Sequence, residues 1–243
     1  VTLQIGTNLV NDVADFYSGA DTEARLGPAR ATQKGWLSAR RVTLGAVLCF
    51  AATFAIGSYL VWLAGWPIFW LGVASIVSGI LYTAGPWPLG YHGLGDLFVW
   101  VFFGFGAVAG TAYVQRLSVP PEAWWAGAAV GALATAILVV NNLRDRSTDA
   151  TVGKRTLVVR FGDRFGRLQF AVSVAAAYLL LAGAALSGVG HGGWWLPWLS
   201  APFALVLVRR LWTREGAALN PLLGATARLG LGFNVLLALG ICQ

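Results

Sequence analysis

Long apolar runs dominate this chain of 243 residues. A helix needs about 20 predominantly apolar residues to cross a bilayer, and runs of about that length recur along the chain. Charged residues make up only 11% of the sequence, against about 25% in a soluble domain. A soluble fold cannot hide so much apolar surface. The sequence therefore predicts an integral membrane protein of the all-α class, built as a multi-spanning transmembrane helical bundle.

The apolar runs predict seven full spans preceded by the remnant of another. The seven spans lie at about residues 42–64, 66–84, 95–114, 123–143, 166–188, 194–212 and 221–241. Residues 1–11 resemble the last turns of an earlier helix, and the chain contains no methionine with which to start. We therefore expect a single transmembrane domain over residues 1–243 whose N-terminus is incomplete.

Positive charges gather on one predicted side of the membrane. If residues 12–41 are placed there, alternation through the spans brings every lysine and arginine to that side except Arg116 and Arg228. Cytoplasmic loops carry such an excess, so residues 12–41 and the loop around 144–167 are predicted to be cytoplasmic. Topology thus explains the net charge of +7. Membrane lipid is an expected partner and nucleic acid is not.

Two polar clusters at the ends of apolar runs each carry a pair of acids. Asp145 and Asp149 are four residues apart, and Asp12 and Asp15 are three apart, which places each pair on one helical face. Adjacent carboxylates repel each other, and Mg²⁺, which takes oxygen ligands and is often shared with substrate phosphates, is the expected cation. We predict that the four acids are catalytic and hold two Mg²⁺ ions bridged by a diphosphate. Solvated loops at a membrane surface are the plainer alternative.

Basic residues follow both clusters after a glycine. Arg30 and Lys34 follow the first cluster, and Lys154 and Arg155 follow the second. Because arginine and lysine pair well with phosphate oxygens, these four side chains are predicted to bind the substrate's diphosphate.

A third stretch, residues 81–96, is rich in Gly and Pro and is predicted to lie on the same side. It carries Tyr82 and Tyr91 and ends in Asp96, which opens an apolar run. An acid at that position faces a cavity or a partner, or it caps the N-terminus of the following helix. Both interpretations stay open.

These three stretches together resemble the UbiA superfamily of intramembrane prenyltransferases. Within it they look most like the menaquinone branch (MenA), which acts on 1,4-dihydroxy-2-naphthoate. The resemblance rests on Asn8-x-x-Asn11-Asp12-x-x-Asp15 with a further acid at Asp21, and on Asn141-Asn142-x-Arg144-Asp145-x-x-x-Asp149-x-x-x-Gly153-Lys154-Arg155. The hydroxybenzoate branch typically has an acid at the position of Gly19, so this departure favours the naphthoate branch.

The resemblance implies a fold of nine helices, from which this chain would lack the first helix and part of the second. It implies transfer of a polyprenyl group from an allylic polyprenyl diphosphate to 1,4-dihydroxy-2-naphthoate, with loss of CO₂ and diphosphate. The reaction would occur on the cytoplasmic side of the plasma membrane of a prokaryote. Further residues would then support the diphosphate (Asn8, Asn11, Asn141) or orient the acceptor (Asp21, Tyr82, Tyr91, Asp96).

Other readings differ in the acceptor or in the class of protein. The acceptor could instead be hydroxybenzoate, another phenol, or a haem or chlorophyll precursor. The D-G-x-x-A-R pattern of CDP-alcohol phosphotransferases is absent from the sequence. A transporter would carry acids at mid-span, whereas every acid except Glu122 lies at or near the predicted cytoplasmic face. Nothing in the sequence indicates an oligomer.

Overall fold

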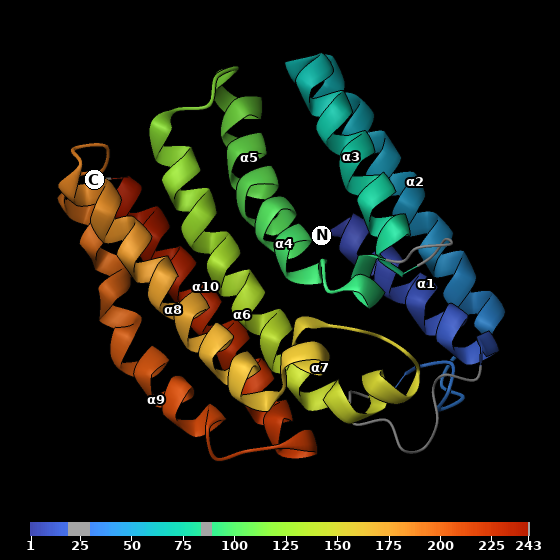
Figure 1. The fold of residues 1–243 in the computed structure, drawn as a ribbon. Coiled ribbons are helices and arrows are strands. Elements are labelled where there is room, and N and C mark those ends of the chain that lie inside the picture. Colours follow the sequence, from blue (N-terminus) through green and yellow to red (C-terminus); the bar gives the residue numbers. More distant parts are fainter. Residues whose placement is uncertain (19–29, 84–88, 243) are drawn as a thin grey trace. The chain divides into compact units, whose positions relative to one another are not determined.

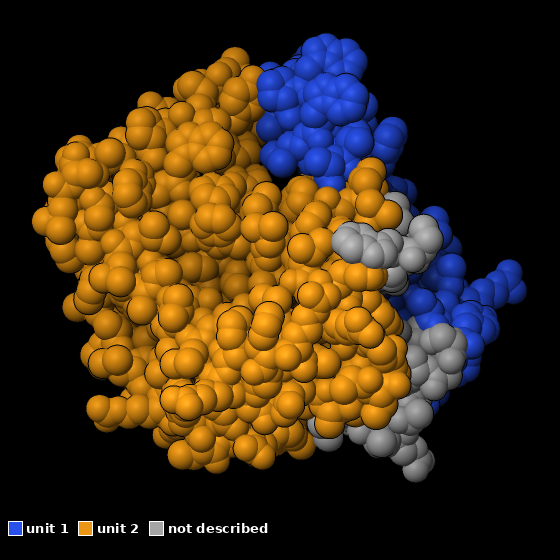
Figure 2. Space-filling model, in the orientation of Figure 1, with its two compact units in different colours: residues 1–74 blue, residues 75–243 orange. Residues whose placement is uncertain are grey.

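The computed structural model describes residues 1–18, 30–83 and 89–242, and every regular element in these ranges is helical (Figure 1). This confirms the all-α class. The chain divides into two compact units, Val1–Ala74 and Ser75–Gln243 (Figure 2). The expectation of a single domain stays a prediction.

Two helices, α1 (Thr2–Ser18) and α2 (Ala39–Ala64), pack against each other in the first unit. Small residues bring them close, because a Cβ on Gly6 would lie 3.3 Å from the Cβ of Cys49. The sequence predicted that the first helix ends at residue 11, but α1 runs to Ser18. Hydropathy detects only the part of a helix that suits the apolar layer, and the polar turns beyond it escape detection. The first acidic pair therefore lies on α1 itself.

A single residue, Gly65, separates α2 from α3 (Trp66–Thr83). Its φ of 76° is a left-handed value that glycine adopts at little cost. The predicted short link between these two spans is thus confirmed. The α3 helix crosses the boundary between the two units.

The second unit is built around α6 (Pro121–Thr151), which packs against α8 (Asp163–Leu186), α10 (Asn220–Ile241) and the π-helical segment η2 (Trp100–Gly106). Figure 1 shows α6, α8 and α10 running side by side. Large side chains such as Leu133, Phe170, Leu181 and Phe233 are buried between them. The other elements of this unit are η1 (Leu89–His92), α4 (Gly95–Val99), α5 (Ala107–Arg116), α7 (Leu157–Phe161), η3 (Gly192–Ser200), α9 (Ala201–Leu211) and η4 (Gly216–Leu219).

Glycines let the backbones of α6 and η2 touch. A Cβ on Gly131 would lie 2.5 Å from the carbonyl oxygen of Trp100, and a Cβ on Gly104 would lie 2.8 Å from the Cα of Gly131. With Gly127, Gly131 forms a Gly-x-x-x-Gly pair on α6, the spacing that permits close helix approach in membranes. The Trp100 Nε1 donates to the Ala128 carbonyl at 3.1 Å and adds a polar contact to the same interface.

Five helices in the described ranges are long and apolar enough to span a membrane: Ala39–Ala64, Gly95–Arg116, Pro121–Arg144, Asp163–Leu186 and Gly216–Ile241. The chain is an integral membrane protein with a multi-span helical fold. Two predicted spans fall outside this set. Trp66–Gly79 is shorter, and 194–212 is divided into the 3₁₀ segment η3 and α9, with Pro197 inside η3. Proline removes an N–H donor and disfavours a regular α-helix there.

Candidate active site

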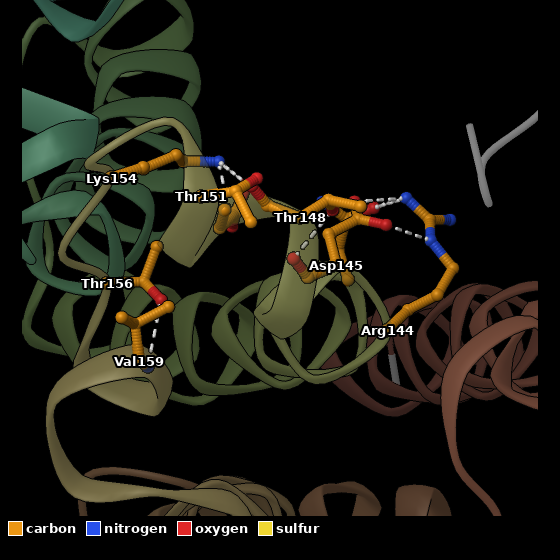
Figure 3. A network of polar contacts seen from close by, with 9 residues as sticks. Arg144, Asp145, Thr148, Thr151, Lys154, Thr156 and Val159 are labelled. Carbon is orange, nitrogen blue, oxygen red and sulfur yellow. Dashed lines mark hydrogen bonds and ion pairs between the residues drawn. The ribbon is translucent and has the colours of Figure 1, made fainter. Parts of the chain in front are cut away.

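The helix α6 carries the second acidic pair past the end of its apolar run. Pro121 occupies its first turn, and the helix continues without a break to Thr151. Asp145 and Asp149 therefore lie one turn apart on one helical face, as predicted from their spacing. Figure 3 shows this end of the helix with the polar side chains around it.

A buried arginine holds Asp145. The Arg144 side chain is only 5% exposed, and it donates from Nε to Asp145 Oδ1 at 2.7 Å and from Nη2 to Oδ2 at 2.6 Å (Figure 3). The same guanidinium donates to Asn141 Oδ1 at 2.7 Å and to Asn220 Oδ1 at 3.1 Å. A planar arginine can serve several acceptors at once. Arg144 thus fixes both the carboxylate of Asp145 and the amide of Asn141.

Lysine 154 folds back onto Asp149. Gly153, at φ 74°, turns the chain after α6, and the Lys154 Nζ lies 3.2 Å from both carboxylate oxygens of Asp149. Burial raises the pKa of the Asp149 carboxyl, and the neighbouring lysine opposes part of that rise. Lys154, predicted to pair with phosphate, is thus paired in this structure with a predicted metal ligand. Arg155 is exposed.

In the first unit, the Asp12 carboxylate ties residues 31 and 32 to α1. It is 6% exposed and accepts hydrogen bonds from the Ala31 N–H at 3.0 Å, from the Thr32 N–H at 3.4 Å and from the Thr32 hydroxyl. A carboxylate offers about four acceptor positions, so about one remains for a further ligand. Close by, the Arg30 Nη1 donates to the Asn8 carbonyl at 3.4 Å.

The remaining predicted residues of this cluster are less constrained. Asn8 and Lys34 are exposed and Asn11 is half-buried. Asp15 lies on α1, but its side chain is outside the described part of the structure, as is all of Asp21. Since Asp12 belongs to the first unit and Asp145 to the second, the grouping of the four acids into one site stays a prediction.

In the third stretch, Asp96 is buried, and it accepts a hydrogen bond from the Gln169 Nε2 of α8 at 2.9 Å. The N-cap position of α4 belongs to Leu94 and has no side-chain cap. Of the two open interpretations, the structure therefore supports a partner for Asp96, with the acid still in the first turn of the helix. Tyr82 is half-buried. Its ring covers Gly95, the first residue of the next span, because a Cβ on Gly95 would lie 2.8 Å from the Tyr82 Oη.

The chain after α6 is fastened to this third stretch. The Arg155 N–H donates to the carbonyl of Tyr91, an exposed residue, at 2.8 Å, and the Arg160 Nη2 donates to the carbonyl of His92 at 2.9 Å. Sequence reasoning brought these two stretches to the same side of the membrane. It missed Arg160 because nothing in its spacing distinguishes it from the other loop arginines.

The acids on α6 suit a hard cation. Asp149 Oδ2 is buried and accepts no hydrogen bond, and its nearest cation is the Lys154 ammonium at 3.2 Å, so this oxygen suits a metal ion that would share it with the lysine. Within the described ranges, no group of three or more His, Cys, Asp or Glu side chains is arranged to hold a metal. Mg²⁺ usually takes one or two carboxylates and completes its shell with water and substrate phosphate. The donor set present therefore fits Mg²⁺ shared with a phosphate, and it does not fit a closed structural metal site.

Comparison with known proteins shows the family of the chain. The profile of the UbiA prenyltransferase family matches residues 1–227. The chain belongs to the UbiA prenyltransferase family. The match extends across α1, which carries Asp12, and α6, which carries Asp145, so both acidic clusters lie inside the region that defines the family.

Two of three similar curated proteins match the chain over almost its whole length, and the third matches about three quarters of it. It is 35% identical to the 1,4-dihydroxy-2-naphthoate octaprenyltransferase of Haemophilus influenzae, over 99% of this chain and 80% of that protein. It is 38% identical to the protein of the same name from Escherichia coli, over 98% of this chain and 80% of that protein. The protein of that name from Mycobacterium tuberculosis is 39% identical over 74% of this chain and 61% of its own length.

Proposed function

We propose that this chain transfers a polyprenyl group from an allylic polyprenyl diphosphate to 1,4-dihydroxy-2-naphthoate, releasing diphosphate and CO₂ and yielding demethylmenaquinol. The observation that carries the proposal is 35% identity over 99% of the chain to a relative named for that acceptor. The polar end of α6 supports it with two acids one turn apart and a lysine beside them.

We assign the diphosphate to two Mg²⁺ ions held by Asp145 and Asp149 and, on the motif alone, by Asp12 and Asp15. Bound Mg²⁺ would neutralise the charge that develops on the departing diphosphate. Lys154 is already held beside Asp149, so it is in place to pair with a phosphate oxygen without a costly search of rotamers. Arg144 keeps the Asp145 carboxylate in one orientation.

The reaction then proceeds by ionisation and carbon–carbon bond formation. The allylic C–O bond breaks and its electron pair leaves with the diphosphate. The ring carbon that bears the carboxylate attacks the allylic cation, and the C–C bond to CO₂ breaks, returning its electron pair to the ring. We assign Arg30, Lys34 and Arg155 to phosphate oxygens, Asn8, Asn11 and Asn141 to support of the ligands, and the orientation of the acceptor to Asp21, Tyr82, Tyr91 and Asp96.

We also propose that the reaction takes place at the cytoplasmic face of a prokaryotic plasma membrane. The support is the positive-inside rule. Both candidate clusters, and the cations that follow them, belong to segments that carry most of the chain's lysines and arginines.

The test uses membranes that contain the protein, a labelled allylic polyprenyl diphosphate, Mg²⁺ and 1,4-dihydroxy-2-naphthoate. Wild type should form a lipophilic prenylated product with release of CO₂, and chelation of Mg²⁺ or the change Asp149→Asn should abolish it. Glu122→Gln is the matched control, because it neutralises an acid in the first turn of the same helix and should leave activity unchanged.

Two outcomes would contradict the proposal in different ways. Transfer to 4-hydroxybenzoate and none to the naphthoate would keep the metal chemistry and refute the acceptor. No release of diphosphate with any acceptor, from protein that unfolds at the wild-type temperature, would refute prenyl transfer itself.

A further inference from the structure

A polar cavity lies in the second unit, with a volume of about 390 Å³. It is formed where α6 ends, α8 begins and η4 leads into α10, at one end of the helices that run side by side in Figure 1. Among its lining residues are four arginines and two acids: Arg144, Arg146, Arg167, Arg214, Asp163 and Glu215.

This cavity uses the face of α6 that turns away from the candidate metal ligands. Ser147 lines the cavity and is two residues from both Asp145 and Asp149. In an α-helix two residues correspond to about 200° around the axis. The cavity is therefore a separate site, and of the candidate active-site residues on α6 only the Arg144 side chain reaches both.

The charge of the cavity is only partly neutralised from within. Arg146 Nη1 is paired with Asp163 at 3.0 Å, and Arg167 Nη2 is paired with Glu215 at 3.1 Å. Arg214 makes no hydrogen bond or ion pair with its guanidinium to any residue in the described ranges. Since one guanidinium has five N–H donors, Arg146 and Arg214 retain donors for an anion in the cavity.

The cavity lies at the level where lipid headgroups meet the protein. Three of its lining residues are the ends of membrane-spanning segments: Arg144 closes one, and Asp163 and Gly216 open two others. Apolar side chains close by in sequence are exposed, Leu168 at 48% and Trp212 at 44%, and suit contact with acyl chains. Basic pockets between spanning helices on the cytoplasmic side are typical sites for anionic lipid headgroups.

We propose that this cavity binds a phosphate group, and that the phosphate belongs to the headgroup of an anionic membrane lipid. Arg214 and Arg146 supply the free N–H donors, and Arg144 and Arg167 form the buried floor. A soluble phosphate or diphosphate offers the same oxygens, but it lacks the acyl chains that the exposed Leu168 and Trp212 would cover.

The experiment is native mass spectrometry of the purified protein in detergent, with added phosphatidylglycerol or phosphatidylcholine. The double variant Arg146→Gln/Arg214→Gln is compared with Arg209→Gln/Arg210→Gln, which removes the same charge from the exposed last turn of α9. At about a fivefold effect per arginine, the first variant should bind phosphatidylglycerol about 25-fold more weakly than wild type. The second should bind as wild type does. If the double variant fails to purify, Arg214→Gln alone gives the same test, because it breaks no ion pair in the described ranges. It should weaken phosphatidylglycerol binding about fivefold.

A second arm titrates inorganic phosphate and diphosphate against the same proteins in lipid-free detergent. The expected result is binding far weaker than that of phosphatidylglycerol, lowered further only by Arg146→Gln/Arg214→Gln, because the same donors would hold the phosphate. Two results would overturn the proposal: an equal loss of phosphatidylglycerol binding in both double variants, or diphosphate binding that depends on Arg214 while the two lipids bind equally well. The readout is binding, so neither result depends on whether the prenyl transfer proposed above is correct.

Discussion

The contact between α6 and η2 makes a sharp prediction for Gly131→Ala. The new Cβ would lie 2.5 Å from the Trp100 carbonyl oxygen and 2.8 Å from the Trp100 Cδ1. Rotation of the Trp100 side chain could relieve the contact with Cδ1, but it cannot relieve the contact with the carbonyl oxygen, which belongs to the backbone. The two helices must therefore separate, and the Trp100 hydrogen bond to the Ala128 carbonyl must lengthen.

Two opposing terms set the size of the effect. Overpacking a tight interface costs about 1–3 kcal/mol, and a carbonyl at 2.5 Å places this case at the upper end. Replacing glycine by alanine within a helix returns about 1 kcal/mol. The net cost is about 2 kcal/mol, which lowers the melting temperature of a protein of this size by about 4–8 °C.

Gly224→Ala on α10 is the matched control, because its Cβ would meet nothing within 4 Å and only the helix-propensity gain remains. The two variants should therefore differ by about 3 kcal/mol, or about 6–12 °C, in thermal unfolding of the detergent-solubilised protein. Gly104→Ala, which meets the same contact, should add little once Gly131→Ala has opened the interface. Equal melting temperatures for Gly131→Ala and Gly224→Ala would refute the packing described above.

Three further predictions concern the polar groups. Burial raises the pKa of the Asp149 carboxyl, so its ionised, metal-binding form should be lost at a higher pH than that of an ordinary aspartate. The Mg²⁺ concentration needed for half-maximal activity should therefore rise on acidification. Lys154→Gln removes the opposing cation and should move that rise to higher pH, and an unmoved profile would contradict the assignment. Thr32→Val, which removes the hydroxyl donor to Asp12, should cost about 1.5–3 kcal/mol of stability, whereas Thr43→Val, whose hydroxyl serves only its own helix, should cost little. Arg167→Gln should lower the melting temperature by about 3–12 °C, because the buried side chain donates hydrogen bonds to the Leu211 carbonyl and to Glu215. Arg164→Gln, on the exposed face of the same helix, should leave the melting temperature unchanged. Equal effects of the two changes would argue against a stabilising role of these buried contacts.

The helices were largely predictable from the sequence because spanning a bilayer imposes length and apolarity on every segment. The ends were less predictable. Hydropathy marks the part of a helix inside the apolar layer, and both α1 and α6 continue as polar turns that carry the acids. The π-helical turn of η2 was not predictable, since it occurs where the backbone meets α6 at Gly131, a tertiary contact that no local pattern encodes.

In the candidate site too, local helix geometry was predictable from the sequence and contacts between distant segments were not. The shared face of Asp145 and Asp149 follows from helix geometry and could be read from spacing. The ties of Arg144 to Asn220 and of Asp96 to Gln169 join residues 76 and 73 positions apart, so they depend on how helices pack. The role of Lys154 was half predictable: its nearness to the acids follows from the glycine turn, but its direct pairing with Asp149 depends on the path of the loop.

The tie between residues 155–160 and the loop before α4 also has a consequence for the order of events during synthesis. The partners of His92 and Tyr91 are Arg160 and Arg155, so the ribosome must translate α4, α5 and α6 before either contact can form. The helices of Gly95–Arg116 must therefore enter the membrane before Tyr91 and His92 have received these two hydrogen bonds. A nascent chain arrested before residue 155 should leave Tyr91 and His92 open to proteolysis, and an arrest beyond α7 should protect them. The contacts of Tyr91 and His92 with residues 155–160 therefore form late in the biogenesis of the enzyme, only after α6 has been inserted.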